Sequence, residues 1–243
     1  MAKEKTPGAR KYLAFDIETA KQTPGDFSNW RKHRPLGICC AATCASDGEP
    51  VLWHSKSAGG APAGKMAPGD TRLLLDHLLA MAEAGYTLVT WNGAGFDFDI
   101  LAEESGGHTE CTGLVHDHVD MMFHVVCLLG FPIGMDKVAE GMSLARKAGG
   151  LSGSDAPALW AKGCHDQVLD YVAQDVRMTL EIAATGDRKN AFSWITQKGM
   201  RRTQALPGGW KPVRAAMTLP LPDTSWMKTP IRREDFLAWV RTK

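Results

Sequence analysis

Two acidic residues stand two positions apart in an apolar segment near the start of the chain. The segment reads Phe15-Asp16-Ile17-Glu18-Thr19. Side chains alternate along a strand, which would put Asp16 and Glu18 on one face while Phe15 and Ile17 enter the core. Two carboxylates this close repel each other unless a cation lies between them, and hard cations such as Mg²⁺ prefer oxygen ligands. Solvated edge carboxylates explain most such pairs, so this pair alone is weak evidence for a metal site.

A further candidate carboxylate follows the strand predicted at residues 87–91. The segment WNGAGFD ends at Asp97, where a strand passes into a helix at the rim of the sheet and ligand sites tend to form. The alternative is that Asp97 only caps that helix. Asp99 competes for the same role, but it falls within the helix, so Asp97 is the preferred candidate.

The segment YVAQD places a phenol and a carboxylate four residues apart, at Tyr171 and Asp175. On a helix these two side chains share a face beside the apolar stripe, which consists of Leu169, Val172, Val176 and Leu180. Taken alone, the pair is equally consistent with an ordinary polar flank.

Together, FDIET, NGAGFD and YVAQD resemble the three motifs of the DEDDy branch of DnaQ-like 3′→5′ exonucleases. The closest resemblance is to the proofreading exonuclease domain of family B DNA polymerases, over about residues 12–185. In the sister branch a histidine stands five residues before the last aspartate, and here that position is Asp170, which favours the tyrosine branch. The resemblance implies an RNase H-like fold, an α/β structure with a mixed β-sheet flanked by helices.

The resemblance also implies that Asp16, Glu18, Asp97 and Asp175 bind two divalent cations, Mg²⁺ or Mn²⁺. Asp16 would bridge both ions, Glu18 and Asp175 would complete the first, and Asp97 would act on the second mainly through water. Tyr171, with an ordinary pKa of about 10, is too weak an acid to serve as a good base at neutral pH. Its hydroxyl is therefore expected to orient the attacking water.

By the same resemblance, Thr19, Asn92 and Phe96 are expected to contact the terminal nucleotide. A chain of 243 residues has no room for a polymerase domain, so the prediction is a stand-alone exonuclease acting on the 3′ end of single-stranded DNA or RNA. The alternatives are an inactive nucleic-acid-binding module on the same fold, a metal-dependent phosphohydrolase of small nucleotides, and a nuclease that cuts internally.

Predicted elements place these motifs at one edge of a sheet. Strands are expected at residues 12–17, 37–44, 51–54, 87–91 and 118–122, and helices at 98–104, 121–129 and 135–142. Asp70 is expected to cap a helix whose apolar face includes Leu73, Leu74, Leu78 and Met81, and a longer helix is expected from about Pro157 to Ala184. The predicted division is a flexible leader (1–10), an exonuclease domain (11–190) and a C-terminal extension (191–243).

Charge divides the chain unevenly. Up to residue 187 there are 16 Lys and Arg against 24 Asp and Glu, whereas the rest has 12 against 3. Residues 198–214 are predicted to line the path of a single strand, with Lys198, Arg201 and Arg202 as substrate contacts, because cations follow phosphates and aromatic rings stack on bases. The alternative is that the basic segment docks on the acidic body, anchored by its tryptophans, which are Trp194, Trp210, Trp226 and Trp239.

Other sequence features exclude several classes. The six cysteines show no regular framework and are expected to be free thiols in the cytoplasm. No apolar run reaches the length of a membrane span, so no membrane partner is predicted, and whether a protein partner exists is left open. Cys111, His116 and His118 lie close in sequence, but their spacing fits no standard zinc pattern.

Overall fold

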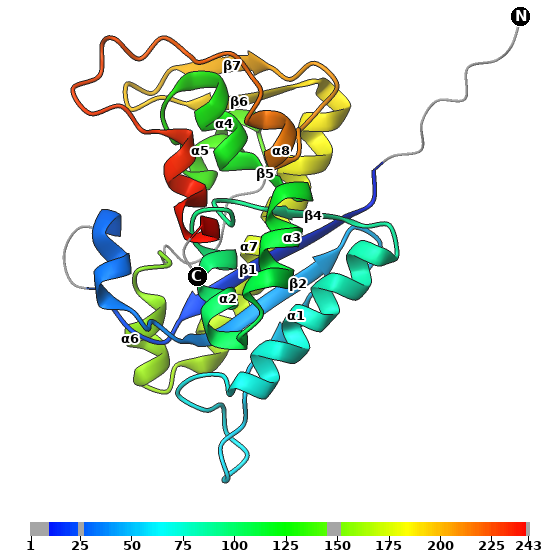
Figure 1. The fold of residues 1–243 in the computed structure, drawn as a ribbon, viewed down its shortest axis with the longest axis vertical. Coiled ribbons are helices and arrows are strands. Elements are labelled where there is room, and N and C mark those ends of the chain that lie inside the picture. The colour runs from blue at the N-terminus through cyan, green and yellow to red at the C-terminus, as the bar shows by residue number, and fades with distance from the viewer. Residues whose placement is uncertain (1–9, 24–26, 145–151, 242–243) are drawn as a thin grey trace, which may run out of the picture.

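A mixed five-stranded sheet forms the centre of the molecule (Figure 1). The structure, a computed structural model, describes residues 10–23, 27–144 and 152–241, so the predicted leader lies outside the described residues except for Arg10. The strand order is β3-β2-β1-β4-β5, in which β1 is antiparallel to β2 and parallel to β4. The strands are β1 (Tyr12–Thr19), β2 (Ile38–Ala45), β3 (Val51–Trp53), β4 (Thr87–Thr90) and β5 (Val119–Asp120). The predicted α/β class with a mixed sheet is confirmed.

Helices cover both faces of this sheet. One face packs on α1 (Pro68–Glu83), α2 (Asp97–Ser105) and α3 (His108–Asp117), and the other on α5 (Met135–Met142), α6 (Ala156–Ala161) and α7 (His165–Lys189). The central strand alternates between the two cores, with Leu13, Phe15 and Ile17 in the first and Tyr12 and Ala14 in the second. Two further helical segments are η1 (Phe27–His33) and α4 (Met121–Leu129).

The C-terminal segment returns to both cores. It contains the hairpin β6 (Ala191–Ile195) and β7 (Arg201–Ala205), followed by α8 (Val213–Ala216) and the 3-10 helix η2 (Arg233–Arg241). The hairpin lies at the top of Figure 1, where β6 contacts α5 and α7. Trp210 is buried in the core that contains α7, and Trp239 is buried in the core that contains α2. These two tryptophans anchor the segment to the body.

Two helix predictions were wrong in detail. The single helix expected from Pro157 to Ala184 is divided into α6 and α7, because Gly163 adopts a left-handed conformation with φ of 82° between them. At α1, Ala67 is the N-cap and the helix begins at Pro68, so Asp70 is not the cap and instead accepts a hydrogen bond from the Ser55 hydroxyl. Leu73 is 59% exposed, and the buried face is formed by Leu74, Leu75 and Leu78.

The sequence pattern did not predict η1 or α3. Only Cys111 and Val115 are buried in α3, so this helix lacks the repeated apolar positions by which a helix is recognised in a sequence. All six cysteines are free thiols. Within the described ranges, no helix is long and apolar enough to cross a bilayer.

Candidate active site

Asp16 and Glu18 lie on the side of β1 that faces α7. They follow the alternation of Tyr12 and Ala14, which pack in the core shared with that helix. Glu18 is only 6% exposed, whereas Asp16 is partly buried. The strand geometry thus presents both carboxylates to the same neighbouring helix, as the alternation predicted.

Asp175 approaches these carboxylates from α7. This helix buries Val172 and Val176 against the sheet, and the face that carries Tyr171 and Asp175 lies beside that contact. Oxygens of Asp16, Glu18 and Asp175 all lie within 4.8 Å of one another, and this is the single group of its kind in the part of the chain that the structure describes. Residues distant in sequence therefore meet in one carboxylate cluster.

The composition of the cluster fits a hard divalent cation. Glu18 and Asp175 are both more than nine-tenths buried, and buried like charges at this spacing are unfavourable unless a positive charge compensates them. Mg²⁺ and Mn²⁺ prefer carboxylate oxygens, and a Mg²⁺ site commonly uses few protein ligands together with phosphate oxygens of a substrate. Asp16, Glu18 and Asp175 are the residues that would hold such an ion.

Asp97 lies next to this cluster without joining the group of three. It is the first residue of α2, not its N-cap, which is Phe96. Its Oδ1 accepts a hydrogen bond of 3.1 Å from the backbone N–H of Ile17, the residue between Asp16 and Glu18. Burial raises the pKa of Asp97 to about 7, and the nearby charge of Asp120 acts in the same direction. Asp97 therefore joins the start of α2 to the strand that carries two of the acids.

Asp99, the competing candidate, is engaged elsewhere. Its carboxylate receives hydrogen bonds from Arg31 Nε at 2.9 Å and from an Arg34 guanidinium nitrogen at 2.6 Å. With only 3% of its surface exposed, this aspartate is a buried acid compensated by two arginines, which is a structural role.

The Tyr171 hydroxyl stays protonated in this environment. Burial raises the pKa of Tyr171 far above its usual value, and the negative charges of Asp175, Glu18 and Asp16 raise it further. Gly153 lies against the same place, since a Cβ on it would be 3.8 Å from a Glu18 oxygen and 3.9 Å from the Tyr171 hydroxyl. The tyrosine can donate a hydrogen bond beside the carboxylates, but it cannot act as a base.

Asp120 is a site residue that the sequence reasoning missed. It is fully buried at the N-terminus of α4 and caps that helix by accepting the Phe123 N–H at 3.0 Å. It also accepts the N–H groups of Asn92 and Ala94, each at 2.9 Å. Burial raises the pKa of Asp120 to about 6 in spite of these bonds. An aspartate before an apolar helix is a cap signal, but the sequence does not show that the same carboxylate also accepts hydrogen bonds from a distant turn.

Three residues predicted to touch the terminal nucleotide lie at the same edge of the sheet. Thr19 ends β1, while Asn92 and Phe96 follow β4, and parallel neighbouring strands end at a common edge. Asn92 has a φ of 77°, which turns the chain toward α2. The Phe96 ring packs edge-on against Trp30 with centroids 5.0 Å apart.

The three basic residues predicted as substrate contacts lie in the β6–β7 hairpin. Arg202 is paired with Trp194 across the two strands, and Arg201 with Ile195, so the two arginines point to opposite faces. Lys198 lies in the connecting turn. None of these three side chains forms an ion pair with an acid in the described residues. Zinc binding by His118 is not favoured, because its ring nitrogens contact the Val115 carbonyl and the Thr90 hydroxyl.

Comparisons with known proteins give a family and a fold. Residues 63–185 match the model of a family described as the RNase_H superfamily, and β1 precedes the matched residues. Searching curated protein sequences finds no match. Among solved structures, the chain is similar to a family B DNA polymerase from the hyperthermophilic archaeon Pyrobaculum calidifontis, with 21% identity, a TM-score of 0.54 and coverage of 75% of this chain. The chain spans 25% of the length of that polymerase.

Weaker similarity is found to two structures of exonuclease I, each with a TM-score of 0.38 over 74% of this chain. The apo form is 14% identical with 42% of its own length covered. The E. coli enzyme in complex with a 5cy-dA13 oligonucleotide is 15% identical with 40% of its length covered.

Proposed function

The chain belongs to the RNase H superfamily, as its motifs predicted, and on that premise we propose that it is a metal-dependent nuclease. More specifically, we propose a 3′→5′ exonuclease of the DEDDy type that hydrolyses phosphodiester bonds at the end of a single strand. The six free thiols fit the cytoplasmic location predicted for it.

One observation carries the proposal. Carboxylates from the first strand and from a helix late in the chain meet within 4.8 Å, with a protonated tyrosine beside them. A solvated pair of acids on a strand would not need a buried third carboxylate from another element. The cluster therefore supports cation binding, and the tyrosine supports a reaction in which a water or phosphate oxygen is positioned beside the cation.

When bound, two Mg²⁺ or Mn²⁺ ions would supply positive charge to the phosphodiester and lower the pKa of water. The residues of the chain hold and orient the reactants. Asp16, Glu18 and Asp175 are the proposed ligands. Asp97 keeps α2 against β1 and would contribute a further carboxylate to the metal site. Tyr171, which remains a donor, positions the attacking water by a hydrogen bond.

The proposed place of the terminal nucleotide is the edge where β1 and β4 end. Thr19 ends β1, Asn92 follows the end of the neighbouring β4, and Phe96 offers an aromatic ring. The buried carboxylate of Asp120 holds the turn that carries Asn92.

The decisive experiment uses variants of the carboxylate cluster. Asp16→Ala and Asp175→Asn are each expected to lower kcat by several powers of ten in Mg²⁺ or Mn²⁺, because a ligand to an ion that stabilises transition-state charge is lost. The matched control is Asp170→Asn, an exposed aspartate next to Tyr171 on the same helix, which is expected to retain wild-type turnover. An Asp16→Ala protein with wild-type turnover would contradict the proposal.

Substrate and direction are read from end-labelled oligonucleotides. A 5′-labelled strand of DNA or RNA should give a ladder that shortens from the 3′ end, and a circular single strand should stay intact. Cleavage of the circle would identify an internal cutter. Binding without any metal-dependent cleavage would identify an inactive nucleic-acid-binding module, and hydrolysis of free nucleotides alone would identify a small-molecule phosphohydrolase.

A further inference from the structure

A groove of about 930 Å³ lies between the β6–β7 hairpin and the body of the protein. One wall is the hairpin from Trp194 to Arg202, and another is formed by residues 131–137 around the start of α5. The loop at residues 226–231 closes the groove on a third side. All three walls belong to the described part of the chain, and none of them contributes a member of the carboxylate cluster.

Exposed aromatic and apolar side chains line this groove. The Trp226 side chain is 67% exposed, and its ring lies edge-on to that of Phe131 with centroids 6.0 Å apart. Trp194 is partly buried at the inner face of the hairpin, and Met200 is 47% exposed. Large apolar side chains gathered at one exposed place mark a binding surface more often than chance, and the flat rings suit a ligand with flat faces of its own.

The charges of the groove are positive. Within the described residues, Lys198 and Arg202 make no ion pair, whereas Lys137 pairs with Glu140 at 3.2 Å. No acidic side chain is among the residues that line the groove. A ligand with negative charges would therefore be attracted here without displacing an existing salt bridge.

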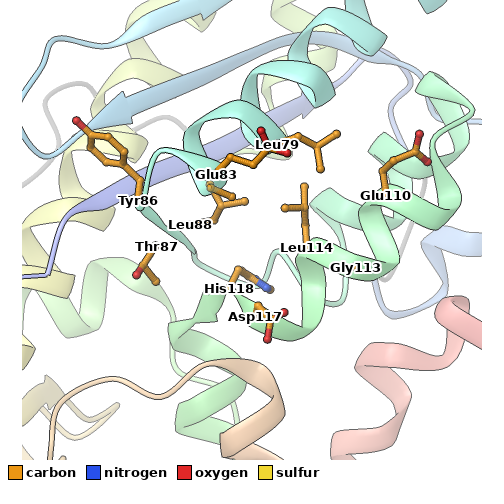
Figure 2. A pocket seen from close by; sticks show the side chains of 11 residues that line it. Leu79, Glu83, Tyr86, Thr87, Leu88, Glu110, Gly113, Leu114, Asp117 and His118 are labelled. Carbon is orange, nitrogen blue, oxygen red and sulfur yellow. The ribbon is translucent and has the colours of Figure 1, made fainter.

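A second pocket has the opposite character. It encloses about 580 Å³ between α1, α3 and the start of β4, and three acids stand at its margin (Figure 2), which are Glu83, Glu110 and Asp117. This pocket also lies at the wrong end of the sheet, because Thr87 begins β4 while Glu18 lies near the end of the parallel β1. Of the two, only the groove under the hairpin suits a polyanion that must reach the carboxylates.

Side-chain contacts link two walls of the groove to the elements that carry the candidate site. Gly134 lines the groove, and the next residue, Met135, accepts a hydrogen bond of 3.4 Å on its sulfur from Thr179. Thr179 follows Asp175 by one turn of α7. On the other side, Ile231 precedes η2, whose Phe236 ring lies against Gly95 in the turn that carries Asn92.

We propose that this groove binds unpaired nucleotides of the strand whose 3′ end lies at the carboxylates. The inference rests on the proposed function and adds a second contact region to it. Trp226 stacks on a base, Trp194 offers an apolar surface at the groove, and Lys198 and Arg202 bind phosphates of the strand. Base stacking on exposed rings combined with cations along the backbone is the means by which proteins hold single strands without sequence preference.

The hairpin provides its own matched control. Arg202 lies opposite Trp194 on the face turned to the groove, whereas the neighbouring Arg201 lies opposite Ile195 and points to the other face. The two side chains have the same charge and are both exposed, so they differ mainly in direction. Arg201, expected from sequence to touch the substrate, is accordingly left out of the groove.

The test measures binding of a 5′-labelled oligo-dT 20-mer by fluorescence anisotropy in EDTA, so that no strand is cut. Trp226→Ala should weaken binding about fivefold or more, because stacking on one base contributes at least that factor. An abasic strand of the same length should bind Trp226→Ala as well as it binds the wild type. Arg202→Ala should weaken the binding of both strands. It should also lower by about one the slope of the logarithm of the binding constant against the logarithm of the salt concentration, and Arg201→Ala should leave that slope unchanged.

Three results would contradict the proposal that the groove binds nucleotides. The first is that Trp226→Ala binds oligo-dT as tightly as the wild type does. The second is that this variant loses the same binding affinity for the oligo-dT and the abasic strands. The third is that Arg201→Ala and Arg202→Ala change the affinity and its salt dependence equally. Binding of a fluorescent Glu-Leu peptide that Trp226→Ala abolishes, without any loss of oligo-dT binding, would make the groove a protein-docking site. The proposed function is tested separately by wild-type hydrolysis of the p-nitrophenyl ester of thymidine 5′-monophosphate, which is too small to reach the groove.

Discussion

Changing Asp120 to Asn tests whether one buried carboxylate holds the turn next to the candidate site. In the wild type, Oδ1 accepts the N–H groups of Asn92 and Phe123, and Oδ2 accepts that of Ala94. Asparagine has nearly the same shape but only one acceptor oxygen. If its oxygen replaces Oδ1, its NH₂ group faces the Ala94 N–H, and if it is turned round, two backbone N–H groups lose their acceptor.

The magnitude follows from these lost acceptors. A buried donor without a partner costs about 1–3 kcal/mol, and the better orientation of the amide leaves two such donors facing each other. We therefore expect Asp120→Asn to lower the free energy of unfolding by roughly 3 kcal/mol. The turn that carries Asn92 would also shift, and a misplacement of about 1 Å can cost on the order of a hundredfold in rate.

Urea denaturation followed by tryptophan fluorescence measures the first effect, and kcat on a labelled oligonucleotide measures the second. Asp117→Asn is the control, because this aspartate pairs with Arg214 on the surface, where both side chains are about two-thirds exposed. Its loss should cost less than about 1 kcal/mol. A free energy of unfolding for Asp120→Asn within about 0.5 kcal/mol of the wild type would refute the role assigned to this carboxylate.

Three other perturbations have definite outcomes. Tyr171→Phe should lower kcat and leave the Mg²⁺ or Mn²⁺ affinity measured by calorimetry unchanged, because its hydroxyl is proposed to orient water, so weaker metal binding would show a different role. Gly141→Ala should destabilise the protein by about 1–3 kcal/mol in urea, since its Cβ would overlap the Trp194 backbone, whereas Gly113→Ala has open space and should be neutral or stabilising. Burial lowers the pKa of His118 to about 4. The contribution of the neutral His118 to the free energy of unfolding is therefore complete above the unfolded pKa of about 6.5. It should fall by about 1.4 kcal/mol per pH unit as the pH drops from there toward 4. Stability of a His118→Gln variant should depend less on pH over that range, and an equal dependence would contradict the assignment.

Local periodicity accounts for the parts of the site that the sequence predicted. Alternation along β1 placed Asp16 and Glu18 on one side, and the helical spacing placed Tyr171 beside Asp175. Neither pattern says that β1 and α7 are neighbours. That contact follows from burial of Val172 and Val176 against the sheet, and at the sequence level it was implied only by the resemblance to a family.

Partners distant in sequence explain what could not be predicted. Asp97 and Asp99 are two residues apart, and what separates their roles is that Arg31 and Arg34 reach Asp99. In the same way, Trp210 and Trp226 both stand among basic residues, yet the first is fully buried and the second is mostly exposed. Composition alone assigns both tryptophans to one class, and only the packing of the C-terminal segment distinguishes an anchor from an exposed ring.

The uneven division of charge can now be assigned to two different uses. Arg233 is buried and donates to the carbonyls of Met217 and Leu219, and Arg214 pairs with Asp117 on α3, so these cations fasten the C-terminal segment to the body. Lys198 and Arg202 have no such partner in the part of the chain that the structure describes, and they lie at the groove. Docking of the basic segment and the proposed strand binding are therefore compatible, because the cations that fasten the segment are different from those proposed to bind phosphates.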